Sequence, residues 1–106
     1  MSKVATLFKD HRTQAATEAT SPKSVVFEGS DEETFFIKAV GSAGTYAIDV
    51  WLFEGWEEID TGALADGVVT VVTLAFTIPK ARLRVTTVAD AVVKAEVHAE
   101  GTEYEG

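Results

Sequence analysis

The chain of 106 residues contains no cysteine, only two histidines and only two prolines. The absence of cysteine excludes disulfides and thiolate metal sites, so the fold must be held by packing or by assembly alone. Histidine is the commonest catalytic base and a frequent zinc ligand, yet neither His11 nor His98 lies in a recognisable motif. We therefore expect no zinc site, no cofactor and no enzymatic activity.

Positive charge is also scarce. Nine Lys and Arg residues stand against 17 Asp and Glu residues, which gives a net charge of −8. Such a charge repels phosphate backbones and anionic lipid, so nucleic-acid and membrane partners are disfavoured. No apolar run reaches the roughly 18 residues that a membrane span requires, and we expect neither a signal peptide nor a membrane segment. Glycine-rich nucleotide-binding motifs are absent as well.

The acidic residues gather in clusters, which are typical of solvated rims that keep a β protein soluble. The clusters contain Asp31, Glu32 and Glu33, then Glu54, Glu57 and Glu58, and finally Glu96, Glu100, Glu103 and Glu105. Calcium is an open alternative, because Asp31, Glu32, Glu33, Asp60 and Asp66 lie at predicted strand ends where loops could gather oxygens, but the EF-hand spacing does not occur. A glycosidase would need two convergent carboxylates; Asp49 and Glu58 are one conceivable pair, although nothing in the sequence sets their separation.

The clearest pattern in the chain is a strand alternation from Thr45 to Asp60. One face carries Tyr46, Ile48, Val50 and Leu52, and the other carries Ala47, Asp49, Trp51 and Phe53. The first face is predicted to lie in the core. The second face combines a charge with two large aromatic side chains, so another segment must cover it or a ligand must use it.

The remainder of the chain shows short strands separated by turn residues, with no helical period. The predicted strands span residues 24–28, 33–40, 45–53, 56–61, 68–78, 81–88 and 91–99, with a bulge or change of sheet near Thr70. Hairpins are predicted at residues 41–44, 54–55 and 89–90. The last hairpin would carry Arg82, Arg84, Lys94, Glu96 and His98 on one outer face. These features predict an all-β fold, an antiparallel β-sandwich of seven or eight short strands that is jelly-roll-like or immunoglobulin-like.

Residues 1–23 lack a sustained period and are predicted to form an extended N-terminal arm, whereas residues 24–106 form the β-sandwich domain. A short strand over Val4 to Phe8 is conceivable, and a disordered leader is the alternative for the whole segment. We expect the arm to lie over the domain or to reach a neighbouring molecule.

Two hypotheses account for the aromatic cluster of Trp51, Phe53 and Trp56. Carbohydrate-binding sandwiches stack sugar rings on such side chains and bind the hydroxyls with nearby acids, here Asp49 and Glu58. Alternatively, a loop, the arm or a neighbouring subunit covers the cluster. We favour the second hypothesis, because exposed aromatic patches are uncommon in soluble monomers and are often buried by assembly.

The segment YAIDVWLFEGWEEIDTGAL, residues 46–64, and the segment IPKARLRVTTVADAVVKAEVHAEG, residues 78–101, together resemble the small β-sandwich virion proteins of tailed bacteriophages. Those proteins share a strand-turn pattern that ends in Trp-x-x-Leu, matched here by Trp56 and Ile59, and a later Arg-Val-Thr, matched by residues 84–86. A leader rich in Thr and Ala corresponds to residues 13–20. The turn departs from the pattern, since Phe53, Glu54 and Gly55 replace Ser or Asn, Asp and Gly.

The resemblance implies a non-enzymatic virion structural protein, a decoration or cement protein on the capsid surface that is made in the host cytoplasm. Its expected partners are the major capsid protein and copies of itself, in a homo-oligomer. The residues expected at subunit or capsid contacts, chosen for their apolar character, are Val4, Leu7, Phe8, Trp51, Phe53 and Trp56. The alternatives are a carbohydrate-binding module and a tail or adhesion component of a virion.

Overall fold

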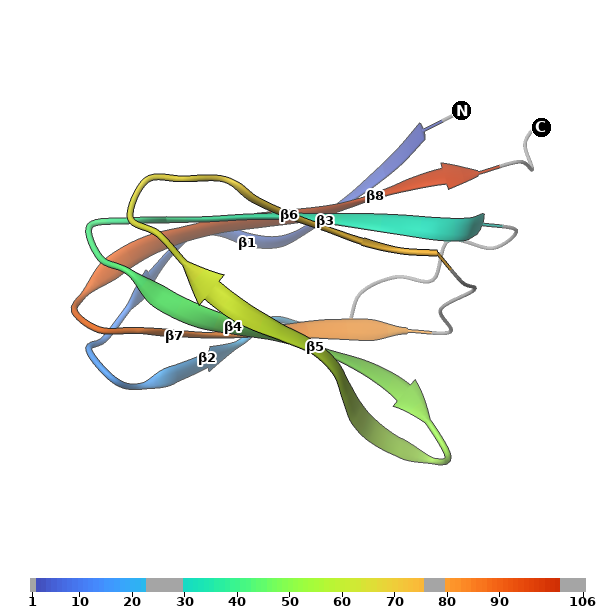
Figure 1. The fold of residues 1–106 in the computed structure, drawn as a ribbon, viewed down its shortest axis with the longest axis horizontal. Coiled ribbons are helices and arrows are strands. Elements are labelled where there is room, and N and C mark those ends of the chain that lie inside the picture. Colours follow the sequence, from blue (N-terminus) through green and yellow to red (C-terminus); the bar gives the residue numbers. More distant parts are fainter. Residues whose placement is uncertain (1, 23–29, 76–79, 102–106) are drawn as a thin grey trace.

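A computed structural model describes residues 2–22, 30–75 and 80–101, and this part of the chain contains eight strands and no helix. The strands are β1 (Ser2–Thr13), β2 (Glu18–Thr20), β3 (Ser30–Val40), β4 (Gly44–Leu52), β5 (Gly55–Leu64), β6 (Thr70–Leu74), β7 (Ala81–Thr87) and β8 (Ala91–Gly101). They form two antiparallel sheets of four strands each, packed face to face (Figure 1). The prediction of an all-β sandwich is confirmed.

The order of the strands is that of a jelly roll, one of the two topologies that the sequence allowed. One sheet has the order β1-β8-β3-β6 and is called the β8 sheet; the other has the order β2-β7-β4-β5 and is called the β7 sheet. Strands pair in a nested way, because β1 pairs with β8, β2 with β7, β3 with β6 and β4 with β5. The first and last strands are therefore neighbours in space (Figure 1).

Two of the three predicted hairpins are wrong. The loops at residues 41–43 and 88–90 connect strands of opposite sheets, since β3 and β8 lie in one sheet and β4 and β7 in the other. Only β4 and β5 form a hairpin at a predicted position. Short Gly- and Ser-containing loops suit a hairpin, but they also span the roughly 10 Å between packed sheets. Consequently, the outward side chains of Arg82 and Arg84 lie far from those of Lys94, Glu96 and His98.

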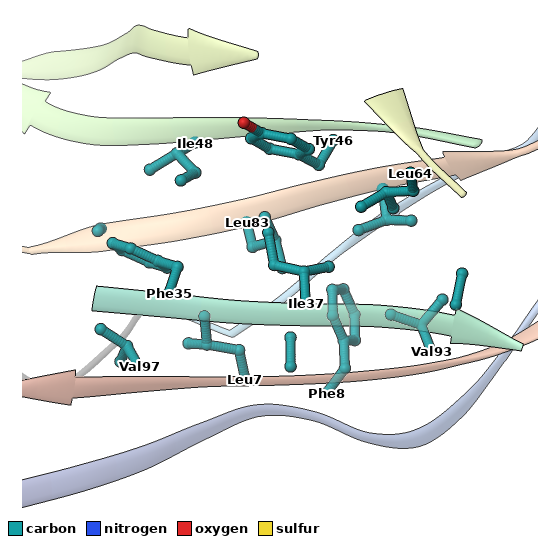
Figure 2. Close-up of a cluster of buried hydrophobic side chains, with 14 of the residues drawn as sticks. Leu7, Phe8, Phe35, Ile37, Tyr46, Ile48, Leu64, Leu83, Val93 and Val97 are labelled. Atoms are coloured by element: carbon teal, nitrogen blue, oxygen red, sulfur yellow. The ribbon is translucent and has the colours of Figure 1, made fainter. Parts of the chain in front are cut away.

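The core lies between the sheets and is built from alternate residues of the central strands. Tyr46, Ile48 and Val50 of β4 point inward, as predicted, and Leu52 packs partly buried at the margin. The largest fully buried apolar side chains are Phe35, Ile37, Ile48, Leu64, Leu83, Val50, Val85, Val93 and Val97, several of which are seen in Figure 2. The inward row of β3 also includes the carboxyl side chain of Glu33.

The amino-terminal segment is part of the sandwich, contrary to its description as an arm separate from a domain that begins at residue 24. β1 pairs with β8 from Ser2 to Thr13, and β2 pairs with β7. Leu7 and Phe8 are both only 5% exposed, although they are consecutive, because the register shifts between Thr6 and Phe8. A bulge of this kind interrupts the two-residue period, so the sequence indicates only the short strand conceivable over Val4 to Phe8 and not the full length of β1.

Two further predictions concern segments at the margins of the described residues. The strand expected at 24–28 lies outside them. The long strand expected at 68–78 is represented by β6, Thr70–Leu74, which pairs with β3 in continuous register, so no bulge occurs at Thr70 within β6. Val72 and Leu74 pack against the core and Val71 is exposed, in agreement with the predicted faces.

Candidate functional site

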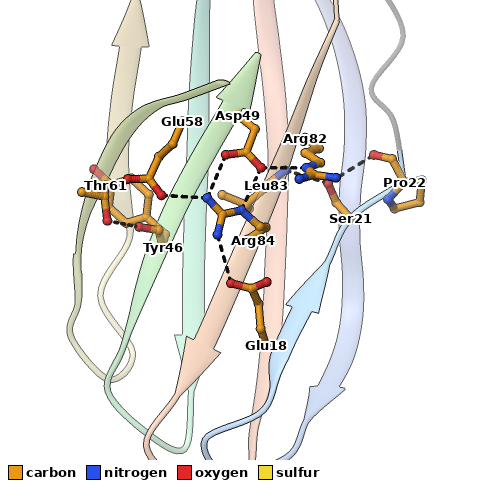
Figure 3. Close-up of polar contacts among 10 residues, drawn as sticks. All are labelled: Glu18, Ser21, Pro22, Tyr46, Asp49, Glu58, Thr61, Arg82, Leu83 and Arg84. Atoms are coloured by element: carbon orange, nitrogen blue, oxygen red, sulfur yellow. Dashed lines mark hydrogen bonds and ion pairs between the residues drawn. The ribbon is translucent and has the colours of Figure 1, made fainter. Parts of the chain in front are cut away.

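The outer face of the β7 sheet brings together charged residues from all four of its strands (Figure 3). Asp49 on β4 lies directly opposite Arg82 on β7 and directly opposite Glu58 on β5. Arg84 follows Arg82 by two residues and therefore shares its face, while Glu18 on the short strand β2 reaches it from the other side. Pairing in the sheet thus creates a cluster from residues that are far apart in the sequence.

Asp49 is the centre of this cluster and is only 2% exposed. Its Oδ2 atom accepts hydrogen bonds from Nε of Arg82 and Nε of Arg84, both at 2.7 Å, and its Oδ1 accepts one from Nη2 of Arg84 at 2.8 Å. Burial by itself raises the pKa of the Asp49 carboxyl, but the hydrogen bonds from Arg84 and Arg82 outweigh it and leave the pKa below its usual value. The carboxylate is consequently ionised and has its acceptor positions occupied.

Arg84 joins this buried carboxylate to two exposed ones. Its Nη1 donates to Oε2 of Glu18 at 3.1 Å, and its Nη2 donates to Oε1 of Glu58 at 2.7 Å. Hydrogen bonds to Asp49 and then to Glu58 raise the pKa of the Arg84 guanidinium, which stays protonated. Asp49 and Glu58 therefore converge, but they converge on an arginine, so they do not form the acid-base pair that a glycosidase would need.

The two tryptophans lie next to the charged cluster, at the end of the β4–β5 hairpin. Trp51 and Trp56 are paired across the strands with ring centroids 5.3 Å apart in a T-shaped contact. Nζ of Lys80 lies 4.5 Å from the ring centroid of Trp51, and Cζ of Arg82 lies 4.5 Å from that of Trp56. Both indoles are half-buried, and each has a cation of the same chain over one face.

Phe53 lies at the end of this hairpin and is 90% exposed. Phe53 and Glu54, which we call the hairpin tip, form a two-residue turn with φ angles of 54° and 63°. The sequence suggested Glu54 and Gly55 as the turn, but Gly55 already belongs to β5. Turns with two positive φ angles normally contain Asn-Gly or Gly-Gly, and a bulky residue in this region costs about 1–2 kcal/mol. In Figure 1 the hairpin projects away from the body of the sandwich.

The six residues predicted at subunit contacts do not form one surface. Trp51, Phe53 and Trp56 lie together on the β4–β5 hairpin. Val4 is exposed on β1, at the edge of the other sheet. Leu7 and Phe8 are buried in the core of their own chain, so in this fold they stabilise the sandwich and have no surface to offer a neighbour.

The two acids of the carbohydrate alternative both bind Arg84 in this structure. Asp49 is occupied by two arginines, and Glu58 accepts a hydrogen bond from Arg84. Metal binding has no candidate either, because residues 2–22, 30–75 and 80–101 contain no group of three His, Cys, Asp or Glu side chains that could hold an ion. Two of the proposed calcium ligands bind protein groups: Asp60 accepts a hydrogen bond from Tyr46, and Asp66 accepts one from the Gly41 amide.

Sequence reasoning placed Asp49, Arg82 and Arg84 on outward faces but did not bring them together. The sequence does carry one relevant signal. Arg82 and Arg84 are two residues apart and therefore share one face of their strand, and Asp49 lies on a strand with the same two-residue period. Glu18 gives no such signal, because the sequence predicts its segment to be an arm outside the sheets. No helix in the described part of the chain is long and apolar enough to cross a membrane.

Comparison of the sequence with models of protein families and with curated proteins finds no match. The hairpin and the two outer faces of the sandwich are therefore the features from which a function is inferred.

Proposed function

We propose that this protein is a non-enzymatic structural protein of a bacteriophage virion, a decoration protein that binds the capsid surface and stabilises the head. The observation that carries the proposal is the hairpin tip, where a large apolar side chain is held almost fully exposed in a strained turn. A sequence with Asn-Gly at these positions would form the same turn at lower energy. The conformation of Phe53 and Glu54 is therefore better explained by contact with a partner than by the stability of the free chain.

The remaining features suit a binding role that involves no chemistry. The charged cluster on the β7 sheet uses its acids and bases on one another and so supports the base of the hairpin. The virion assignment rests on the resemblance of residues 46–64 and 78–101 to small β-sandwich virion proteins. Eight-stranded jelly rolls are also frequent among viral capsid domains, which is an argument from analogy of fold.

The proposal is tested on particles produced from a genome that encodes this chain. Purified particles are analysed by mass spectrometry, and electron microscopy of particles with a tagged chain locates the tag. We expect the protein in many copies on the head. Its absence from purified particles would overturn the proposal, and a label confined to the tail would replace it with a tail or adhesion component.

The contact itself is tested with Phe53→Ser, which removes the exposed ring. Tagged variant and wild-type proteins are added to undecorated shells, and bound protein is measured after sedimentation. We expect the variant to bind at least ten-fold more weakly. Val88→Ser is the control, because Val88 is also exposed, at 74%, but lies in a loop remote from the tip.

Carbohydrate binding is the second candidate, and the Trp51-Trp56 pair is the observation that favours it. Each indole has a cation over one face, and the other face could stack on a sugar ring. A glycan array with the wild-type protein and with Trp56→Ala tests this candidate. Binding that disappears in the variant would support it, whereas an array without signal would remove it.

A further inference from the structure

We infer that copies of this chain associate head to tail, with the hairpin tip of one copy entering a groove on the outer face of the β8 sheet of the next. This inference deepens the proposed function and rests on it, because it assigns a partner to the tip that the function requires. It joins two surfaces of the same chain that lie on different sheets, each of which combines exposed apolar side chains with charges opposite to those of the other.

The acceptor surface, which we call the β8 groove, lies over β3 and β8 beside the segment that leads into β6. Its lining includes the side chains of Phe36, Lys38, Val69 and Lys94. Val69 is half-exposed, and Val71, also half-exposed, lies opposite Phe36 on the neighbouring strand. The groove therefore offers an apolar floor of the kind that an aromatic side chain can cover.

Two lysines stand over this floor. Lys38 and Lys94 are directly opposite each other on β3 and β8, an arrangement of like charges that destabilises a sheet. Lys94 reaches Asp10 at 3.3 Å, but both side chains are about 60% exposed, so this ion pair contributes little. Lys38 forms no ion pair with the described residues, and the acid of the groove, Glu96, contacts His98. An incoming acid would relieve the repulsion between the two lysines.

The hairpin tip carries the complementary groups. Phe53 supplies an exposed aromatic ring. Glu54, next to it in the turn, and Glu57, on β5 opposite Val50, are exposed carboxylates of the same hairpin. Within the described part of the chain neither glutamate forms an ion pair. A hairpin with an exposed ring and two acids thus matches an apolar floor with two lysines beside it, in a protein whose overall charge of −8 makes basic surfaces scarce.

The two surfaces cannot meet within one molecule. The β8 groove lies on the outer face of the β8 sheet, whereas the tip belongs to the β7 sheet and projects away from the β8 sheet (Figure 1). A symmetric contact between two tips would bring Glu54 and Glu57 of both copies together, and their repulsion opposes it. The remaining arrangement is a heterologous contact, which closes into a ring or extends as an open chain.

A second apolar groove exists but fits the tip less well. It lies at the far end of the β7 sheet and is lined by Ala16, Ala43, Gly44, Thr45, Thr86, Thr87 and Val88. None of these side chains carries a charge, so Glu54 and Glu57 would lose water there without gaining a partner. This groove provides the matched control for the experiment.

The experiment measures association of the full chain by sedimentation velocity at concentrations up to about 1 mM. The high concentration is needed because a contact made by one hairpin tip in one groove is small and is expected to be weak in solution. We expect the wild type to form chains or rings as its concentration rises. Phe53→Ser and Lys38→Glu should each weaken association at least ten-fold, whereas Val88→Ser should leave it unchanged. Lys38→Glu should remain folded, since it converts a like-charge pair with Lys94 into an opposite-charge pair.

Mixing the two defective variants gives a sharper result. Phe53→Ser retains an intact groove and Lys38→Glu retains an intact tip, so one contact can form between them and no further contact can follow. An equimolar mixture should therefore contain heterodimers and no larger species, while each variant alone stays monomeric. A mixture that stays monomeric, or variants that associate as the wild type does, would overturn the inference.

These outcomes are separate from those that test the proposed function. A wild type that remains monomeric at about 1 mM but is found on purified heads overturns head-to-tail association and leaves the decoration role standing. A wild type that forms chains through the tip but is absent from particles overturns the decoration role and leaves head-to-tail association standing. Association that is lost in Val88→Ser would reassign the acceptor to the second groove and overturn the inference.

Discussion

Asp49 has an unusual position for a residue on the outer face of a sheet, because its carboxylate is buried by the arginines that bind it. Replacement by Asn keeps its size but removes the charge that holds Arg82 and Arg84. Breaking a buried pair costs about 3–5 kcal/mol, and since the arginines are partly exposed we expect a loss of about 2 kcal/mol in the free energy of unfolding. Urea denaturation of the variant and of the wild type measures this loss in the free energy of unfolding.

Glu18→Gln is the matched control for this prediction. Glu18 binds the same arginine, but its side chain is 48% exposed, so its loss should cost less than about 1 kcal/mol. Equal losses in the two variants would contradict the view that burial of Asp49 gives the cluster its strength.

Glu33 is the opposite case, a carboxyl that points into the core at 3% exposure with no hydrogen bond from a described residue to offset its burial. Burial raises its pKa from 4.5 to about 7. The unfolded chain ionises Glu33 at lower pH than the folded chain does, so stability falls as pH rises from 4.5 through 7. By pH 8 the loss is at most about 3 kcal/mol.

Glu33→Gln should remove this loss. We expect the variant to gain stability relative to the wild type as pH rises, with the difference growing between pH 4.5 and 8 in urea melts. Other titrating groups cancel in the difference; Asp49, whose pKa is lowered, acts only at more acidic pH, where its contribution is lost as it is protonated. A difference that does not vary with pH would show that Glu33 is ionised freely in the folded state.

The direction of many side chains was predictable from the sequence, and their surroundings were not. Alternation placed Tyr46, Ile48 and Val50 in the core correctly. Alternation also placed Asp49 outward, but its burial depends on arginines from another strand. Leu7 and Phe8 were predicted at an interface because a bulge conceals the period of their strand.

At the level of elements, the turn between β4 and β5 offers a direct test of strain. Replacing both residues of the tip by Asn and Gly, as Phe53→Asn with Glu54→Gly, suits the positive φ angles. We expect the double variant to gain about 1–2 kcal/mol in free energy of unfolding, because the native residues are disfavoured there. It should at the same time lose association, as Phe53→Ser does. Loss of stability in the double variant would contradict the assignment of strain.

Gly44, the first residue of β4, is required for a different reason. A Cβ atom there would lie 2.3 Å from the carbonyl oxygen of Thr86, so Gly44→Ala must push β4 and β7 apart. We expect a loss of about 3 kcal/mol, measured by thermal unfolding. Gly55→Ala is the control, since a Cβ atom at Gly55 meets nothing within 4 Å, and it should change stability by less than about 1 kcal/mol.

The number and type of elements followed from the sequence, whereas their pairing did not. Six of the predicted strands correspond to described strands, because periods of two residues and turn residues are local signals. The loops after β3 and β7 are predicted as hairpins but connect opposite sheets, because a short loop does not reveal which sheet the next strand joins. Pairing partners such as β1 and β8 are decided by packing of the whole chain.

On the scale of the whole molecule, two of the four edge strands, β5 and β1, are poorly suited to contact between copies edge to edge. β5 leaves a free edge that carries Glu57, Glu58 and Asp60, and two copies of it would repel each other. β1 forms another edge, which two register shifts make irregular.

The charges at the contact between the hairpin tip and the β8 groove predict its dependence on salt. Glu54 and Glu57 would face Lys38 and Lys94 near the protein surface, where ions screen the attraction within about 10 Å at 0.1 M salt. We expect sedimentation velocity to show that association of the wild type weakens several-fold between 0.05 M and 0.5 M sodium chloride. The part of the association that persists at high salt is expected from the apolar contact of Phe53. Association that strengthens with salt would indicate a contact without these charges.

The nested pairing of the strands also determines when the fold can be completed during synthesis. β8 is the last of the described strands, yet it lies in the middle of its sheet, between β1 and β3. Until the ribosome has released β8, neither β1 nor β3 has this partner, and the inward side chains of both remain open to water or to other chains. The sandwich can therefore close only after β8 has left the ribosome. Until then, the apolar faces of the earlier strands are exposed in a crowded cell.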